Sequence, residues 1–327
     1  MKRRTVLRGL AGSAGSIMTI PALAQDRYPE RPIRLVVAFS AGGPTDLMAR
    51  RLAERLGAHL GQSVVVENKT GAAGTIGATE VARARPDGYT LIVAVSSSHA
   101  IAATLMRRPT FDPVKDYAGV AVLGTVPMAL AVHPSFPART LQDFLRVAQD
   151  APEGLSYGTS GAGGIAHLSG ELFQREARGI KLTPVHYRGA STALQDLLAN
   201  NIPIVMDTMA SIAEPYRGGQ VRILATFAEQ RSPYLPDLPT AREQGLPGVV
   251  SNTYNAVLAP AGTPASVLAT LNGAVRTALA DPTMQAFMAS NLVDPFPDPT
   301  PERTMVFIRS ELEKWRPVVQ ATGLSME

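Results

Sequence analysis

A loop of small residues, Ser40 to Gly43 (Ser-Ala-Gly-Gly), is the segment of this chain best suited to binding chemistry. It follows an apolar run, Ile33 to Phe39, and precedes Pro44 and Asp46, which suit the first turn of a helix. Backbone N–H groups at such a helix start are partly positive, so the loop can bind a carboxylate. A tight strand-to-helix turn also needs glycine. Asp46 is either a helix-start charge or a residue that shapes the loop.

Similar loops end later apolar runs. Asp207, which follows Ile204–Met206, would either accept a hydrogen bond from a ligand amino or hydroxyl group or cap the next helix. Ser97 and Ser160 would either donate a hydroxyl hydrogen bond to the ligand or cap a helix. Arg188, a cation in a loop, would bind a ligand carboxylate or pair at the surface or between domains.

Catalytic and metal-binding patterns are weak. Gly158 to Ala162 begins like a nucleophile elbow but lacks its final glycine, so an exported hydrolase is only an alternative. His167 and Glu171 share a helical spacing that could present two metal ligands, without a third. There is no phosphate-binding lysine loop or dinucleotide fingerprint. We therefore expect no catalytic residue, no metal and no cofactor.

The first 24 residues have the features of an export signal. Arg3-Arg4 and two further basic residues precede an apolar run, and Pro21 to Ala24 offers a cleavage site after Ala24. The twin arginines fit the twin-arginine route, although an ordinary Sec signal could look similar. This segment holds four of the 31 basic residues and none of the 27 acidic ones, so the mature chain has no net charge. We expect a periplasmic protein without an electrostatic footprint for nucleic acid or an anionic membrane.

Strand-like and helix-like segments alternate after the leader, which predicts an α/β fold with mostly parallel sheets. Two long apolar segments, Val120–His133 and Tyr254–Pro260, are suited to crossing between two domains. The predicted boundaries give one lobe from residues 25–125 and 229–327 and a second lobe from residues 126–228. In such sheets ligands bind beyond the carboxyl ends of the strands, where the small-residue loops lie.

Several motifs in order carry a family resemblance. They are Tyr28-Pro29 with Arg31-Pro32-Ile33, Gly42-Gly43-x-x-Asp46, Asn68-x-x-Gly71-Ala72, Pro86-Asp87-Gly88-Tyr89-Thr90-Leu91, Leu155-Ser156-Tyr157-Gly158 with Ala166-His167-Leu168, Tyr187-x-Gly189, Leu238-Pro239-Thr240 with Glu243-x-Gly245-Leu246-Pro247, and Ala259-Pro260-Ala261-Gly262-Thr263-Pro264. Along nearly its whole mature length the chain resembles the Bug-type periplasmic solute receptors of tripartite tricarboxylate transporters.

The resemblance implies a two-lobed α/β binding protein of the type II kind, with a ligand cleft at the hinge and no enzymatic activity. It implies a monomer that captures a small organic acid and delivers it to the membrane subunits of a transporter. A receptor that signals through a membrane sensor would have the same pocket. Carried over residue by residue, the ligand-binding positions are Phe39, Ala41, Gly42, Gly43 and Asp46 on one lobe, Ser160, Gly161, Ala166 and Asp207 on the other, and Ser97, Tyr187, Arg188 and Gly189 as wall residues.

The chain departs from the family pattern at several of these loops. Ala38 and His186 stand where proline is usual, Ala73 where glycine is usual, and Ala102 or Ala103 where asparagine is usual. Ala73 puts the close approach of its loop in doubt. Together these departures indicate an altered ligand without identifying it.

Overall fold

Helices and strands alternate along the chain, in the order that the sequence predicts. The computed structural model describes residues 28–326, so the predicted signal peptide lies outside the described residues. The strands are β1 Ile33–Val37, β2 Val64–Asn68, β3 Thr90–Ala94, β4 Tyr117–Val132, β5 Leu155–Thr159, β6 Leu182–His186, β7 Ile204–Thr208, β8 Arg222–Thr226, β9 Asn252–Pro260 and β10 Asp294–Pro295. The α-helices are α1 Pro44–Leu60, α2 Thr75–Ala82, α3 Ala102–Leu105, α4 Leu141–Gln149, α5 Ile165–Ala177, α6 Ala190–Leu198, α7 Met209–Arg217, α8 Ala265–Ala280, α9 Pro282–Ser290 and α10 Pro301–Thr322, with a 3-10 turn at Ala72–Gly74 and a π turn at Ser97–Ile101. None of the helices in this part of the chain is both long and apolar enough to span a membrane.

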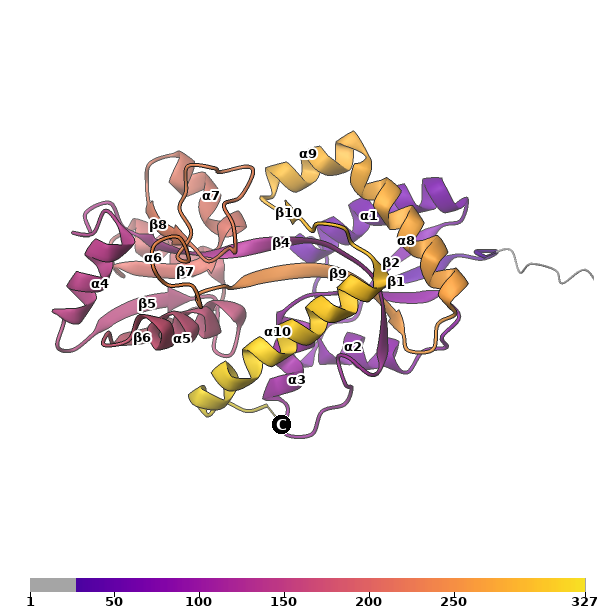
Figure 1. Ribbon diagram of the computed structural model, residues 1–327, viewed down its shortest axis with the longest axis horizontal. Coiled ribbons are helices and arrows are strands. Elements are labelled where there is room, and N and C mark those ends of the chain that lie inside the picture. The colour runs from indigo at the N-terminus through magenta and orange to yellow at the C-terminus, as the bar shows by residue number, and fades with distance from the viewer. Residues whose placement is uncertain (1–27, 327) are drawn as a thin grey trace, which may run out of the picture.

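The strands form two lobes joined through one extended sheet, with the order β2-β1-β3-β9-β4-β7-β5-β6 (Figure 1). In the first lobe β1 is parallel to β2 and β3, and in the second lobe β5 is parallel to β6 and β7. The remaining strands, β8 and β10, pair with β4. The predicted two-lobed α/β architecture is therefore confirmed.

Strands β4 and β9 connect the lobes. They pair antiparallel from Tyr117 opposite Pro260 to Pro127 opposite Asn252, and β4 then continues into the second lobe beside β7 and β8. Both strands contain the segments that the sequence predicts to cross between domains.

The direction of these two strands sets the direction of all the others. Because β3 is antiparallel to β9, it runs with β4 and points its carboxyl end toward the second lobe. Strand β7 runs against β4 and points its carboxyl end back toward the first lobe. By register, the carboxyl end of β3 lies level with Val122 of β4, and the carboxyl end of β7 lies level with Met128 of β4. At about 3.3 Å per residue, these two positions are about 20 Å apart along β4. The loops that follow the strands of both lobes project into this interval.

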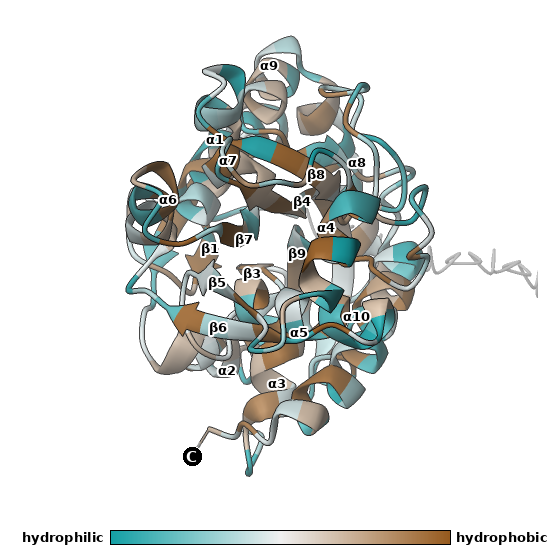
Figure 2. Ribbon diagram, turned by 90° about the vertical axis from the view of Figure 1, so that its left-hand side faces the viewer, coloured by the Kyte–Doolittle hydropathy of each residue, from teal (hydrophilic) through white to brown (hydrophobic). Residues whose placement is uncertain are grey.

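Alternating side chains of the strands pack against helices on both faces of each lobe. In the first lobe Leu35 packs with α1 and α8, whereas Val36 packs with α2 and α10. In the second lobe Val205 packs with α6 and α7, whereas Met206 packs with α4 and α5. The end-on view in Figure 2 shows these two pairs of helices on opposite sides of the second lobe.

Residues 241–249 pack differently from the predicted division, although Ser232, earlier in the same segment, donates to Asp294 of the first lobe. Ala241 and Val249 lie in the core that holds Met206, and Gln244 Nε2 donates to Leu224 O of β8 (2.9 Å). We therefore propose that the chain returns to the first lobe near residue 250 rather than 228.

Helix α10 also reaches across the lobes. Trp315 and Val318, near its carboxyl end, are buried with Leu105 of α3 and with Leu168 and Leu172 of α5. This apolar cluster joins the lobes on the side of the molecule where α10 runs diagonally below β9 (Figure 1).

The loop before α2 contains two alanines in a backbone conformation that favours glycine. Ala72 and Ala73 have φ of 46° and 54°. The doubt raised by Ala73 is resolved by its neighbour Gly74, where a Cβ would lie 2.5 Å from Ser98 Cβ and 3.1 Å from Ala38 Cβ. The loop thus approaches both segments closely, and the alanines add strain because a left-handed L-residue costs about 1–2 kcal/mol.

Replacing Ala73 by glycine should therefore stabilise the protein. After the added flexibility of the unfolded chain is subtracted, we expect a melting temperature about 1–2 °C higher. Ala58→Gly, in the exposed and normally helical end of α1, is the matched control and should lower the melting temperature. Thermal unfolding followed by circular dichroism would contradict the strain if both variants were destabilised.

Candidate functional site

The loop between β1 and α1 is held from beneath by Asp46. One carboxylate oxygen, Oδ2, accepts hydrogen bonds from Gly42 N and Arg50 Nε, each 2.8 Å long. The other, Oδ1, accepts from Asn68 Nδ2 (2.9 Å), which also donates to Phe39 O (2.9 Å). Asp46 is only 1% exposed. Of the two roles open from the sequence, these contacts favour the one that shapes the loop.

The same contacts set the charge of Asp46. Its pKa falls to about 2, chiefly because of the hydrogen bond from Arg50, with further lowering by Gly42 N and Asn68 and an opposing effect of burial. Asp46 therefore stays ionised, and its charge is compensated inside the loop. The loop can then present its other main-chain donors outward without carrying a net negative charge.

Three loops of the first lobe converge at the carboxyl ends of their strands. Gly74, after β2, lies against Ala38 after β1 and Ser98 after β3. Ala41 and Gly42 are exposed, Phe39 and Ser97 are half-buried, and a Cβ on Gly42 would meet no heavy atom within 4 Å. Phe39, Ala41, Gly42 and Ser97 are thus accessible at the end of the first lobe from which its loops project, whereas Asp46 is buried beneath them.

The second lobe presents a comparable loop between β5 and α5. Gly161 and Gly163 have φ of 145° and 70°, which only glycine adopts readily. Gly164 is the N-cap of α5 and supplies no side-chain cap, as is also true of Gly43 for α1 and Gly189 for α6. In contrast, Thr140 and Thr208 cap α4 and α7 with their side chains. Helices α1, α5 and α6 thus leave first-turn N–H groups available to an anion.

Only the main chain of Ala166 is placed where a ligand could reach it. Its side chain is fully buried in the second-lobe core, while its N–H belongs to the first turn of α5.

We call the stretch where β4 passes from its pairing with β9 to its pairing with β7, around Gly124–Ala129, the crossing. Asp207, at the end of β7, is the most unusual charged group near it. It is 4% exposed, and Oδ1 accepts from Thr208 N (2.7 Å) and Ser211 Oγ (3.2 Å). Its other oxygen, Oδ2, has no hydrogen-bond partner among the described residues. Burial raises the pKa of Asp207 despite the hydrogen bonds from Thr208 and Ser211. Nearby Ser160 also favours the charged form, although its geometry falls short of a hydrogen bond to Oδ2.

The predicted wall residues after β6 differ in how free they are. Tyr187 is turned toward α6, where its hydroxyl donates to Asp196 Oδ2 (2.8 Å), and its pKa rises to about 12 through burial and this partner. Arg188 is exposed, and a Cβ on Gly189 would meet no heavy atom within 4 Å. The main chain of this loop and Arg188 are therefore more accessible than the Tyr187 hydroxyl.

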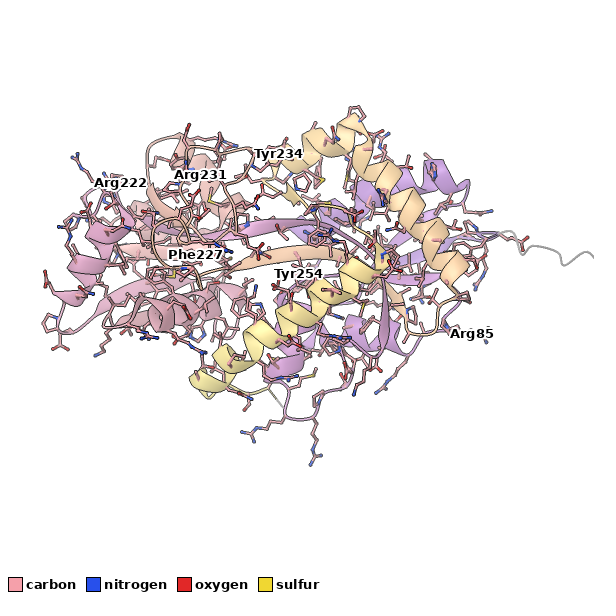
Figure 3. All side chains as sticks on the ribbon, viewed as in Figure 1. Arg85, Arg222, Phe227, Arg231, Tyr234 and Tyr254 are labelled. Carbon is pink, nitrogen blue, oxygen red and sulfur yellow. The ribbon has the colours of Figure 1, made fainter. Side chains whose placement is uncertain are left out.

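The sequence analysis missed three polar residues around the same crossing, each with a buried side-chain atom. Thr226 Oγ1, Asn252 Oδ1 and Asn255 Oδ1 also lack partners within residues 28–326. By register Asp207 and Thr226 flank Ala129 of β4, and Asn252 and Asn255 pair with Pro127 and Gly124. Figure 3 marks the region through Phe227, next to Thr226, and Tyr254 on β9. In the sequence, the two asparagines of β9 could have indicated this polar region, because most of that strand is apolar.

Within residues 28–326, no hydrogen bond joins Ser160, the serine of the elbow-like segment, to a histidine. His186 Nδ1 bonds to Thr159 Oγ1 (2.9 Å), and Asp207 bonds to Thr208 and Ser211 rather than to a histidine. In the described residues, no three His, Cys, Asp or Glu side chains are arranged to hold a metal.

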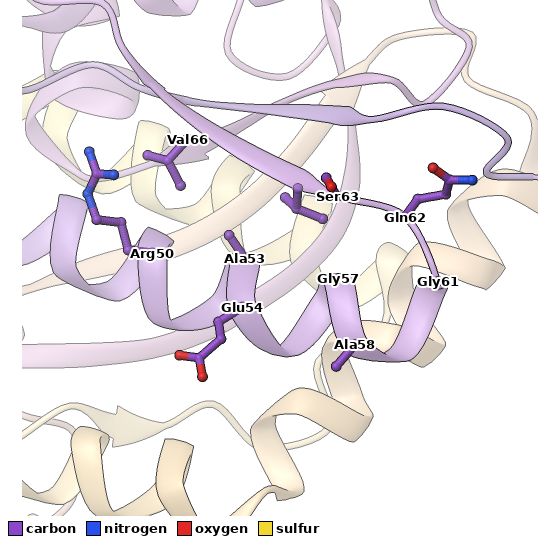
Figure 4. A pocket seen from close by; sticks show the side chains of 10 residues that line it. Arg50, Ala53, Glu54, Gly57, Ala58, Gly61, Gln62, Ser63 and Val66 are labelled. Carbon is purple, nitrogen blue, oxygen red and sulfur yellow. The ribbon is translucent and has the colours of Figure 1, made fainter.

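An open groove of about 680 Å³ lies elsewhere, between α1 and β2 (Figure 4). Ala53, Gly57 and Gln62 line it, at the carboxyl end of α1 and the start of β2. These residues lie at the opposite end of the strand from the loops described above, and of the residues that hold the first loop only Arg50 also lines the groove.

Asp46→Asn should loosen the first loop. We expect a fall in melting temperature of about 2–6 °C at pH 7, because a hydrogen-bonded charge contributes about 1–2 kcal/mol. The pKa of Asp46 is depressed in the folded protein, so its stabilisation is present above pH 4 and is lost as the pH falls toward 2. Thermal unfolding from pH 2 to 7 tests this, with exposed Asp237→Asn as control. A difference that stayed constant down to pH 2 would contradict the assignment.

Comparisons with known proteins agree with this architecture. The family described as "Tripartite tricarboxylate transporter family receptor" matches residues 48–324. Protein BugT of Bordetella pertussis is 34% identical over 307 residues, which cover 93% of each chain. Two solved structures from Rhodopseudomonas palustris are each 33% identical. Rpa4515 with adipate has a TM-score of 0.76 and covers 91% of this chain and 99% of its own, and MatC with bound malate has a TM-score of 0.73 and covers 89% and 100%. With a family match over most of its length and two lobes built around crossing strands, the chain belongs to the tripartite tricarboxylate transporter receptor family.

Proposed function

We propose that this receptor captures a small organic acid between its lobes and holds a carboxylate with main-chain N–H groups. The observation that carries the proposal is the pair of opposed loops, Ser40–Gly43 and Ser160–Gly164, each leading into a helix without a side-chain cap. Both follow strands whose carboxyl ends face each other across the crossing. A carboxylate placed there would receive donors from both lobes and would favour their closure.

Main-chain donors suit a receptor that must also release its ligand. An ion pair buried between the lobes would require desolvation of two charges, which costs several kcal/mol per ion. Here Asp46 and Arg50 already compensate each other inside the first loop, and Arg188 is exposed. The ligand charge would therefore be held mainly by helix termini and loop amides.

Asp207 would recognise the part of the ligand beyond its carboxylate. Its unpartnered Oδ2 can accept a hydrogen bond from a ligand hydroxyl or amino group, or donate one when the carboxyl is protonated. Its raised pKa makes the protonated form more accessible than for an ordinary carboxyl. Thr226 and Asn252 would supply further polar groups at the base of the same site. These groups would distinguish a hydroxy or amino acid from an unsubstituted one.

The ligand class that best fits is a small dicarboxylate, because relatives with similar folds hold adipate and malate. We place the mature protein in the periplasm, after cleavage following Ala24, as a monomer without cofactor or catalytic activity. It would deliver its ligand to the membrane subunits of a tripartite transporter. Neither nucleic acid nor the membrane surface is expected as a partner.

Gly43→Leu should abolish binding and leave the fold intact. A Cβ at this position meets only Ser40 O, at 3.5 Å, so the side chain would extend into the space proposed for the ligand. We expect affinity to fall at least about a hundredfold, with the melting temperature of the free protein within about 2 °C of wild type. Calorimetry with the tightest-binding acid of a panel containing malate, succinate and adipate measures the loss. Gly273→Leu, at an open site on α8, is the control, and tight binding by the Gly43 variant would remove the first loop from the site.

Asp207→Asn should change ligand preference more than stability. The substitution keeps the size of the side chain but replaces one acceptor oxygen with a donor. We expect the ratio of affinities for malate over succinate to fall at least about tenfold, since sites built around a ligand hydroxyl depend strongly on its partner. Competition binding against both acids gives the ratio. An unchanged ratio would return Asp207 to a helix-capping role.

A further inference from the structure

The second-lobe loop rests on a pair of histidines that the proposed site does not use directly. His167 of α5 and His186 of β6 meet edge to face, with ring centroids 4.6 Å apart. His167 is only 6% exposed. The Nδ1 atom of His167 bonds to Gly163 in the loop, and the Nδ1 atom of His186 bonds to Thr159, the residue just before the loop.

The contact of His167 fixes its protonation state. Gly163 N donates a hydrogen bond to His167 Nδ1 (3.0 Å), so Nδ1 must carry a lone pair. The proton of the neutral ring is then on Nε2, which lies 3.7 Å from Glu171 Oε1. A protonated imidazole has donors at both nitrogens and could not accept from Gly163. Only neutral His167 therefore fits the observed loop.

His186 supports the beginning of the same loop. Its Nδ1 lies 2.9 Å from Thr159 Oγ1, which accepts a longer hydrogen bond from Gly161 N (3.4 Å). Burial and the neighbouring His167 lower the pKa of His186, whereas Glu171 raises it.

We propose that His167 is a positioning residue for the second-lobe loop, and that its protonation releases Gly163 and weakens ligand capture. The inference rests on the proposed function, because it assumes that Ser160–Gly164 contacts the ligand. The neutral ring fixes the glycine-rich loop in the geometry that presents its amides. Acid removes that support, so the receptor holds its ligand less tightly as the pH falls.

The groups that face His167 come from three elements. The ring of His186 of β6 lies edge to face with it, Glu171 Oε1 of α5 lies 3.7 Å from its Nε2, and Tyr157 of β5 donates to the main-chain oxygen of His167 (3.2 Å). On the side of α3, Leu105 is the nearest neighbour of Gly163. An imidazolium near a bound carboxylate would attract it, and that effect would have the opposite sign to the one proposed.

The test compares three proteins between pH 8 and pH 6, where dicarboxylates remain largely ionised and imidazoles titrate. Wild type should lose at least about threefold in affinity for the tightest-binding acid of the malate, succinate and adipate panel. His167→Asn places an amide oxygen near the position of Nδ1 and should bind as wild type does at pH 8 without that loss. His167→Leu has no acceptor and should bind at least about tenfold more weakly at both pH values. Exposed His59→Asn, on α1, should retain the wild-type pH profile.

A measurement without ligand separates this inference from the proposed function. Amide hydrogen exchange of a peptide spanning residues 160–167, corrected for intrinsic exchange, should show protection that wild type loses at pH 6 and His167→Asn keeps. Wild-type protection in His167→Leu, or stronger ligand binding by wild type in acid, would overturn the role of His167. The expected exchange pattern without binding of any panel acid would instead contradict the proposed function and leave the positioning role intact.

Discussion

The antiparallel pairing of β4 with β9 is the constraint on which the rest of the structure depends. A single strand of 16 residues pairs within the first lobe along one part of its length and with β7 and β8 of the second lobe along the other. Because β3 runs antiparallel to β9 and β7 runs antiparallel to β4, the carboxyl ends of both parallel sets face one another. The strand directions alone therefore bring the loops of the two lobes together. No direct contact between the loops is needed to align the lobes.

Unsatisfied polar groups then concentrate at this crossing. Protein interiors normally pair such groups, yet Asp207, Thr226, Asn252 and Asn255 each retain a buried atom without a partner in the described part of the chain. The helices that start nearby lack side-chain caps at Gly43 and Gly164. Donors on the helix termini and acceptors on the strands together suit a ligand with a carboxylate at one end and a hydrogen-bond donor elsewhere.

Two departures from the family pattern acquire physical meaning in this arrangement. His186 stands where proline is usual, and a proline there would have no side-chain atom able to form a hydrogen bond with Thr159. Ala73 adopts a left-handed conformation that glycine would adopt without strain, while Gly74 makes the close approach to Ser98. The first departure adds a polar contact beneath the second-lobe loop, and the second adds strain beside the first-lobe loops.

The sequence by itself determined the elements, the two crossing strands and the glycine loops, because apolar periodicity and turn residues act over a few neighbouring positions. The family motifs added the two-lobed arrangement. Only the tertiary structure decided that Asn68 reaches back to Asp46, that Ala241 and Val249 pack in the core that holds Met206, and that Asp207 keeps one oxygen without a hydrogen-bond partner among the described residues. These features depend on which distant segments of the chain come into contact and on how deeply the side chains are then buried. A local pattern of residues predicts neither the contact nor the burial.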